Sequence, residues 1–388
     1  MNFLESADWN LPIPIHYGPG RIAELGAICR TAGMRKPLLV TDRGSRDLSF
    51  ISAALASLQQ AGGRATIFSE VSPNPTDRDV AQGRQHFHDG AHDGVVAIGG
   101  GSGMDAGKAI SLVANNQHDI WAFDYDNAAP PSFRSADFVP LVCIPTTAGT
   151  GAETESTAML THTERAVKGC VWHASHKPHA ALLDPQLTLE LPVNLTAWTG
   201  VDALVHAIEA LTVPAFHPPC DALALEAIRL IYRWLPSAVH DGTNLQARGA
   251  MLVGSCLAGV SFLKGLGLVH AMSHMIGAVH NTHHGLTNAV LLPLVLRHNR
   301  SALGEKTALM CRAMDLPQHD FEAFYTAIVA LLNELDIPTS LSALGIDSES
   351  LAELARKSHG DAACATNAQA TSVADINALL TEAMLSVR

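Results

Sequence analysis

The chain has 388 residues, of which 47% are hydrophobic, 16% charged and 5% aromatic, and 25 Lys and Arg against 37 Asp and Glu give a formal net charge of −12. This apolar fraction excludes disorder as the main state of the chain, and the length predicts two or three domains. The acidic balance disfavours nucleic acid and anionic membrane surfaces as partners, because both would repel the protein.

The sequence predicts a cytoplasmic protein without a membrane anchor. No apolar run approaches the roughly 20 residues that a bilayer span needs, and residues 1–8 carry acidic side chains without a basic segment, so we expect no secretory signal. The seven cysteines form no Cys-x-x-Cys pair, which indicates reduced, mostly buried thiols.

The first half alternates short apolar runs with segments of helical periodicity. Strands are predicted at 13–17, 36–42, 64–69, 94–98 and 139–144, and helices at 22–30, 50–60, 76–88 and 104–113. Strands that alternate with helices predict right-handed crossovers and a parallel sheet.

After about residue 190, long Ala- and Leu-rich segments with a period near 3.6 replace the strand-like runs. Helices are predicted at 195–211, 221–240, 245–262, 269–278, 350–357 and 372–384. We therefore expect an α/β domain over residues 1–190 and an all-helical domain over residues 191–388.

Two glycine-rich turns follow apolar strands, at Gly99–Asp105 and at Pro145–Glu153. Glycine lets the backbone approach an anion closely, and the helix that follows the first turn offers free N–H groups at its N-terminus. The first turn lacks the third glycine of the dinucleotide fingerprint, because Met104 stands there, and Ser102 and Ala109 break the Walker pattern. A tight turn with local threonine hydrogen bonds is the alternative, but two such turns together predict a pyrophosphate site. Its candidate residues are Gly100, Gly101, Ser102, Asp105, Thr146, Thr147 and Thr150.

Asp42 closes the second predicted strand. A carboxylate at this position can accept both hydroxyls of an adenosine ribose and repels a 2′-phosphate, so it predicts NAD rather than NADP as the cofactor. The alternative is an ordinary turn or helix-capping aspartate.

Histidines of the second half fall at helical spacing. Asp202 and His206 are four residues apart, as are His270 and His274, and His283 and His284 follow ten residues later. A buried carboxylate with several imidazoles is costly unless a cation unites them, and such a set suits iron(II) or zinc. The zincin pattern is absent because Ala271, not Glu, follows His270.

At these residues the chain resembles the iron-containing (group III) alcohol dehydrogenases along essentially its whole length. The shared motifs are 73–76, 99–108, 145–153, 200–209 and 270–285. The resemblance implies a nucleotide-binding α/β domain, a helical domain, and a cleft between them for NAD(P) and one metal ion. It places the metal ligands on Asp202, His206, His270 and His284, and His274 near the nicotinamide as the group that passes on the proton. Asn74 then lies near the nicotinamide ribose, with Lys168 as a further cofactor candidate.

The function expected is hydride transfer between a nicotinamide and a short-chain alcohol or aldehyde, in a homodimer or higher homo-oligomer. Two other classes stay open: a dehydroquinate synthase or glycerol dehydrogenase type of enzyme that acts on a polyol or sugar phosphate, and a non-catalytic nucleotide-binding or metal-sensing module. The former usually has a carboxylate and two histidines as ligands, so the fourth ligand argues against it.

The segment 262–270 is similar to the branch of the family that includes 4-hydroxybutyrate dehydrogenases. Phe262 and Lys264 are its candidate substrate residues, and the Lys264 ammonium is expected to anchor an anionic substrate tail while the metal holds the reacting oxygen. The alternative is a solvent-facing lysine whose stem covers apolar surface.

Overall fold

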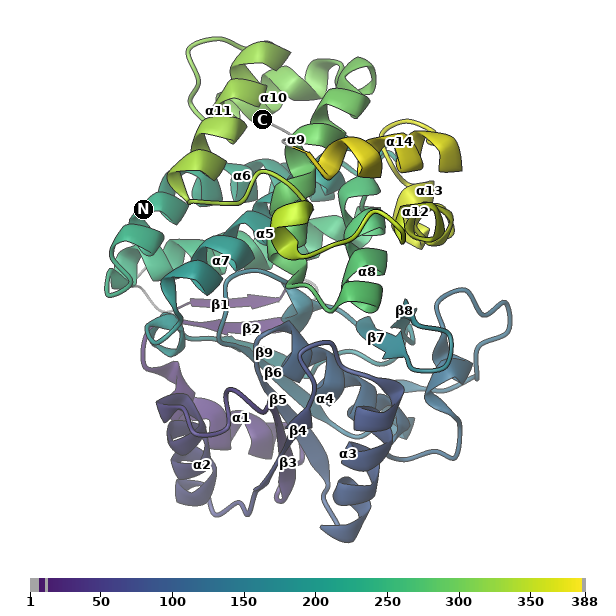
Figure 1. Ribbon diagram of the computed structural model, residues 1–388. Helices are drawn as coiled ribbons and strands as arrows, with labels where there is room; N and C mark the ends of the chain where they lie inside the picture. The colour runs from purple at the N-terminus through teal and green to yellow at the C-terminus, as the bar shows by residue number, and fades with distance from the viewer. Residues whose placement is uncertain (1–6, 11–12, 386–388) are drawn as a thin grey trace. The chain divides into compact units, whose positions relative to one another are not determined.

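The computed structural model describes residues 7–10 and 13–385 of the chain (Figure 1). The expectation of no secretory signal rests on residues 1–8, and residues 1–6 lie outside the described residues. The chain separates into two compact units. The first contains the residues up to Thr147 and Ala152–Glu190, and the second contains Ala148–Gly151 and the chain from Leu191 onward.

The first unit is built on a seven-stranded sheet with the order β1-β2-β9-β6-β5-β3-β4. Six strands run parallel, as the sequence predicts, and β1 pairs antiparallel with β2 at one edge. The strands are β1 (Ala7–Asn10), β2 (Pro14–Tyr17), β3 (Pro37–Asp42), β4 (Thr66–Val71), β5 (Gly94–Gly99), β6 (Leu141–Pro145) and β9 (Ala180–Leu183).

Helices cover both faces of this sheet. Alternate residues of one strand point to opposite faces, so Leu38 and Val40 of β3 join one buried cluster and Leu39 joins the other. The first cluster includes residues of α3 (Asp77–Asp89) and α4 (Gly101–Val113), and the second includes residues of η1 (Arg21–Glu24), α1 (Leu25–Thr31) and α2 (Ser49–Gln60). Figure 1 shows the two helix pairs on either side of the strands. Burial on both faces explains why these strands read as continuous apolar runs.

The order of the strands places the predicted nucleotide loops together. From β3 the chain passes to β4 on one side, and it then returns to β5 on the other side of β3. The carboxyl ends of β3 and β5 therefore meet at the point where the strand order reverses, which is where open α/β sheets bind ligands. Asp42 ends β3, and the loop that begins at Gly99 follows β5.

Four strands of the first unit, β1, β7, β8 and β9, were missing from the sequence prediction. The hairpin of β7 (Ala158–His162) and β8 (Val167–Val171) forms a separate two-stranded sheet. Strand β8 reads Val-Lys-Gly-Cys-Val, which lacks the polar–apolar alternation of a predicted strand, and β9 reads Ala-Ala-Leu-Leu, which suits a helix equally well. The short helices of this unit are η2 (Ile120–Phe123), η3 (Ser135–Asp137), η4 (Ala152–Thr154) and η5 (Pro185–Thr188).

The second unit is helical throughout its described residues, as predicted. Helix α5 (Val193–Thr212) is buried along nearly all its length and packs against α6, α7 and α9. The other elements are α6 (Pro218–His240), α7 (Leu245–Ser261), η6 (Phe262–Lys264), α8 (Leu268–His280), α9 (His284–Leu303), α10 (Glu305–Ala313), α11 (Phe321–Glu334), η7 (Ser342–Leu344), α12 (Leu351–His359), α13 (Ala362–Ala365) and α14 (Val373–Ala383). A helix that is apolar on all sides is a core helix, so any charged residue on α5 needs a partner inside the protein.

One stretch of the described chain is long and apolar enough to cross a membrane, although the sequence analysis expected none. It is Leu245–Lys264, 20 residues long, in which an 18-residue window has a mean hydropathy of 1.2 and is 78% buried inside the protein. Core helices of soluble proteins have the same composition, and this one packs against α5 and α6.

Candidate active site

The four residues predicted to hold a metal ion converge inside the second unit. Asp202 and His206 lie one turn apart on α5, His270 lies on α8, and His284 is the first residue of α9. Each offers one ligand atom, and these four atoms lie within 4.8 Å of one another. The neighbouring His283 caps α9 through the N–H of Leu286 instead, and it lies outside the group.

A glycine lets the helices approach closely enough for this convergence. Gly285 follows His284 at the start of α9, where α9 packs against α5. A Cβ atom on Gly285 would lie 2.4 Å from the carbonyl oxygen of Trp198 and 3.1 Å from Cβ of Asp202. Only glycine therefore fits where His284 comes alongside Asp202.

The donor set fits a divalent first-row cation. Asp202 is 2% exposed, and its Oδ1 lies 3.8 Å from Nε2 of His270 and 3.6 Å from Nε2 of His284. Burial lowers the pKa of His206 to about 4, so this ring is neutral and keeps a lone pair for a cation. One buried carboxylate with three imidazoles is the chemistry of an iron(II) or zinc site.

Glu209 orients the His270 ring. Its Oε2 lies 2.6 Å from Nδ1 of His270, and its carboxylate also accepts the backbone N–H groups of Gly267 and Val269 at the start of α8. Burial by itself lowers the pKa of His270, but the hydrogen bond and negative charge of Glu209 outweigh it and the net pKa is raised. The carboxylate holds the proton on Nδ1, which leaves Nε2 directed at Asp202. The sequence analysis missed this role, although Glu209 follows His206 by three residues on the same face of α5.

Two further side chains hold histidines of the site. Oγ of Ser273 lies 2.8 Å from Nδ1 of His284. Oδ2 of Asp361 lies 2.9 Å from Nδ1 of His274, and the His274 ring stacks on that of His284 with centroids 5.3 Å apart. His274 is therefore adjacent to the ligand group without belonging to it, as the family resemblance implied. Asp361 is 87 residues from its partner, so no local spacing in the sequence revealed it.

The two predicted substrate residues are placed differently. The ring of Phe262 lies next to that of His206, with centroids 5.0 Å apart. The Lys264 ammonium is buried, lies 2.5 Å from Oδ1 of Asp221 and donates to the carbonyl of Leu211. It is neither solvent-facing nor free of partners, and this geometry favours a structural role over the anchoring role.

In the first unit the predicted phosphate loops lie against each other. The N–H of Thr146 donates to the carbonyl of Gly99 at 2.9 Å, and a Cβ atom on Gly100 would touch Thr147. Oγ of Ser102 donates to the carbonyl of Pro73 at 2.5 Å, which ties the turn that contains Asn74 to the same loop. The residues gathered in this way are Gly100, Gly101, Ser102, Asn74, Thr146 and Thr147, whereas Thr150 belongs to the second unit with Ala148–Gly151.

Asp42 lies beside this loop. A Cβ atom on Gly99 would lie 3.3 Å from Oδ2 of Asp42, and one on Gly103 would lie 3.3 Å from its backbone nitrogen. The carboxylate also accepts the N–H and the hydroxyl of Ser45. Asp42 therefore forms the local turn that the sequence offered as its alternative role. Its carboxylate also lies beside the glycine loop, as a ribose-binding role requires.

Asp105 and Lys168 lie within electrostatic reach of each other. Burial raises the pKa of Asp105 to about 6, and the positive charges of Lys108 and Lys168 oppose that rise. Lys108 itself is buried and donates to the carbonyl of Ala152.

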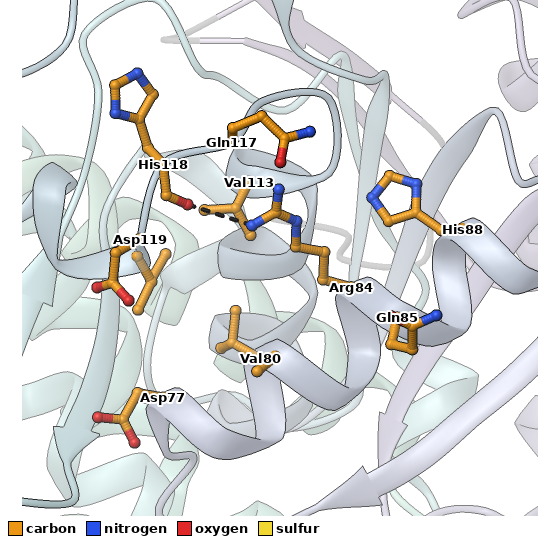
Figure 2. A pocket seen from close by; sticks show the side chains of 11 residues that line it. Asp77, Val80, Arg84, Gln85, His88, Val113, Gln117, His118 and Asp119 are labelled. Atoms are coloured by element: carbon orange, nitrogen blue, oxygen red, sulfur yellow. Dashed lines mark hydrogen bonds between the residues drawn. The ribbon is translucent and has the colours of Figure 1, made fainter.

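A hollow of about 630 Å³ on the first unit lies elsewhere, between α3 and the end of α4 (Figure 2). Arg84 reaches across it and donates to the carbonyls of Asn116 and His118. None of the sequence-predicted site residues lines this hollow.

Two family models cover nearly the whole chain. The model described as iron-containing alcohol dehydrogenase matches residues 12–185, and the C-terminal model of the Fe-containing alcohol dehydrogenase family matches residues 196–384. The chain belongs to the iron-containing alcohol dehydrogenase family. It is therefore an oxidoreductase, and this result favours the alcohol dehydrogenases over the other classes that the sequence analysis left open.

Individual members of the iron-containing alcohol dehydrogenases match along their full length. The chain is 35% identical over 374 residues to an NAD-dependent methanol dehydrogenase of Bacillus methanolicus, covering 95% of this chain and 97% of that one. It is 34% identical over 381 residues to a 4-hydroxybutyrate dehydrogenase of Cupriavidus necator, covering 95% and 98%. The crystal structure of a 1,3-propanediol oxidoreductase superposes with a TM-score of 0.90 at 36% identity, covering 98% of this chain and 99% of that one.

We predict that Glu209→Gln weakens divalent metal binding about 10- to 100-fold, the usual effect of losing a carboxylate behind a ligand histidine. Chelator competition on the purified protein measures the dissociation constant. Glu226→Gln is the control, because Glu226 pairs with Arg229 on α6 and takes no part in the ligand group. Equal metal affinity of Glu209→Gln and wild type would show that the carboxylate only caps α8.

We predict that Lys264→Met lowers the free energy of unfolding by about 1–3 kcal/mol, because it leaves the partly exposed carboxylate of Asp221 without its cation. It should change kcat/KM for 4-hydroxybutyrate and for 1-butanol by the same factor. Urea unfolding and paired kinetics measure both quantities. A selective loss for the acid would restore the anchoring role.

Proposed function

We propose that the protein is an NAD-dependent, metal-assisted dehydrogenase that interconverts a short-chain alcohol and its aldehyde. The observation that carries this proposal is the group of Asp202, His206, His270 and His284, in which the first three side chains are buried and His284 is partly exposed. A buried carboxylate among imidazoles is costly unless a cation joins them.

These four side chains would hold iron(II) or zinc. Such a cation supplies Lewis acidity, which lowers the pKa of an alcohol hydroxyl and polarises a carbonyl in the reverse direction. The protein would contribute a prearranged ligand group: Glu209 and Ser273 fix the rings of His270 and His284 through Nδ1, and apolar helices bury Asp202, His206 and His270.

His274 is the proposed proton carrier. Asp361 accepts the hydrogen on Nδ1 of His274, so Nε2 is the nitrogen that takes up a proton. The stacking of its ring on that of His284 supports this role, because a group beside the ligand set would lie near the reacting hydroxyl, and its burial would shield the proton from bulk water.

The proposed NAD-binding domain is residues 1–190, which is the first unit together with residues 148–151. The proposed metal- and substrate-binding domain is residues 191–388. NAD supplies the hydride acceptor. The loops at Gly100–Ser102 and Thr146–Thr147 would hold its phosphates, and Asp42 would accept the ribose hydroxyls. The adjacency of the two loops and the position of Asp42 at the reversal point of the sheet support this assignment, as does the NAD dependence stated for the methanol dehydrogenase.

The proposed substrate is a small alcohol, with or without a carboxylate. Relatives named as methanol dehydrogenase and 4-hydroxybutyrate dehydrogenase span both possibilities, and the partners of Lys264 weaken the sequence argument for an acid. A panel of methanol, 1-butanol, 1,3-propanediol and 4-hydroxybutyrate, assayed anaerobically by NADH absorbance with iron(II) or zinc added back, ranks these substrates by kcat/KM.

We predict that His270→Ala abolishes stoichiometric metal binding and activity together, because it removes one of four ligands. Metal content is measured by elemental analysis after anaerobic reconstitution. His280→Ala is the matched control, since His280 lies on the same helix but bonds to Ser350 outside the ligand group. Full activity in a metal-free His270→Ala protein would contradict the proposed function.

We predict that Asp42→Gly raises the ratio of kcat/KM for NADP to that for NAD, because the carboxylate that repels a 2′-phosphate is gone. Asp47→Gly, which removes an exposed carboxylate farther along the same loop, should leave the ratio nearer that of wild type. If the wild-type enzyme already prefers NADP, the assignment of Asp42 is wrong.

A further inference from the structure

Asn288 stands at the centre of the ligand group, although it is not one of the four predicted ligands. It lies on α9 one turn after His284 and is 0% exposed. Its amide nitrogen lies 2.7 Å from Oδ1 of Asp202, 3.2 Å from Nε2 of His270 and 3.1 Å from Nε2 of His284. One amide nitrogen thus contacts three of the four ligand residues.

These contacts differ in kind from those of the other side chains around the site. Glu209 and Ser273 hold the rings of His270 and His284 by Nδ1, the nitrogen that faces away from Asp202. Asn288 approaches both rings at Nε2, which carries the lone pair in this tautomer of His270. The amide hydrogens and a cation would therefore compete for the same lone pairs.

The bond to Asp202 is not subject to this competition. A carboxylate oxygen has a second lone pair, so Oδ1 of Asp202 can accept from the amide and serve a cation at once. This bond is also the shortest of the three and is charge-assisted, which makes it roughly twice as strong as a bond between neutral groups. An amide nitrogen has only two hydrogens for the three acceptors, so the Asp202 bond is the one that persists.

Packing does not explain why an amide occupies this position. Oδ1 of Asn288 is buried and has no hydrogen-bond partner among the described residues. A buried, unpaired amide oxygen costs free energy, and a leucine would have the same number and branching of side-chain atoms without that cost. The hydrogen bonds of the amide nitrogen to the ligand residues compensate the free-energy cost of the unpaired oxygen.

We propose that Asn288 is a positioning residue of the metal centre. In the metal-free protein its amide donates to Asp202 and to the ring of either His270 or His284, and so keeps these ligand atoms close to one another. With the cation bound, its hydrogen bond to Asp202 fixes the direction of the carboxylate. This inference rests on the metal site of the proposed function and assigns to it a residue outside the ligand set.

The test compares Asn288→Leu with Asn299→Leu in the full-length protein. Asn299 is a buried asparagine on the same helix whose amide bonds to Asn367 instead of the ligand group. Both variants lose a buried amide, so both should be less stable in urea. Chelator competition with zinc should show a dissociation constant about 10- to 100-fold higher for Asn288→Leu and an unchanged one for Asn299→Leu.

A second readout separates positioning from packing. The visible absorption of the cobalt(II)-loaded protein reports the arrangement of ligands around the ion, and it should change in Asn288→Leu but not in Asn299→Leu. Asn288→Ser, which keeps a hydroxyl donor on a shorter side chain, serves if the leucine variant does not fold, and it should also bind zinc more weakly than wild type.

The outcomes distinguish this inference from the proposed function. A wild-type protein that binds no divalent metal would refute the proposed function. Wild-type metal binding with unchanged affinity and cobalt spectrum in the Asn288 variants would overturn the positioning role alone. Tighter zinc binding in those variants would also overturn it, because the amide would then only compete with the cation.

Discussion

The burial of Asp202 among apolar helices is the constraint on which the second unit depends. A carboxylate removed from water is costly unless a cation or a full set of donors compensates it, and α5 buries Asp202 and Glu209 on the same face. Glu209 is satisfied by His270 and by the start of α8. Asp202 faces two Nε2 atoms and one amide. The helices that converge here supply most of a cation site before any cation binds.

The two proposed binding sites rely on different parts of the chain. In the second unit, cation binding would depend on side chains, because a small cation needs several ligand atoms at fixed distances. In the first unit, phosphate binding would depend on the backbone, because the strand order brings two loop ends together and glycines leave N–H groups accessible to an anion. The hydride transfer proposed for this protein needs both the nucleotide site and the cation site, since neither a bound nucleotide nor a bound cation transfers a hydride alone.

The sequence predicted those features that repeat at a fixed local spacing. The ends of strands β3, β5 and β6 and of helices α5 to α8 lie within a few residues of the predicted ends. These elements are buried along most of their length, and continuous burial leaves a clear apolar pattern in the sequence. The helical spacing of Asp202 and His206 and of His270 and His274 indicated a metal site, and the family resemblance assigned the four ligands. The contacts of His274 with Asp361 and of His270 with Glu209 join residues 87 and 61 positions apart, so no local spacing revealed these pairs. Lys264 was assigned to substrate from its position near His270, but the fold pairs it with Asp221.

The most direct test of the metal centre is X-ray absorption at the metal edge of the anaerobically reconstituted wild-type enzyme. We expect one equivalent of iron(II) or zinc, coordinated by oxygen and nitrogen atoms that include those of three imidazoles. Four of the seven cysteines, at positions 220, 256, 311 and 364, are buried in the same unit. A sulfur-containing first shell, or a spectrum with fewer than two imidazoles, would contradict the account.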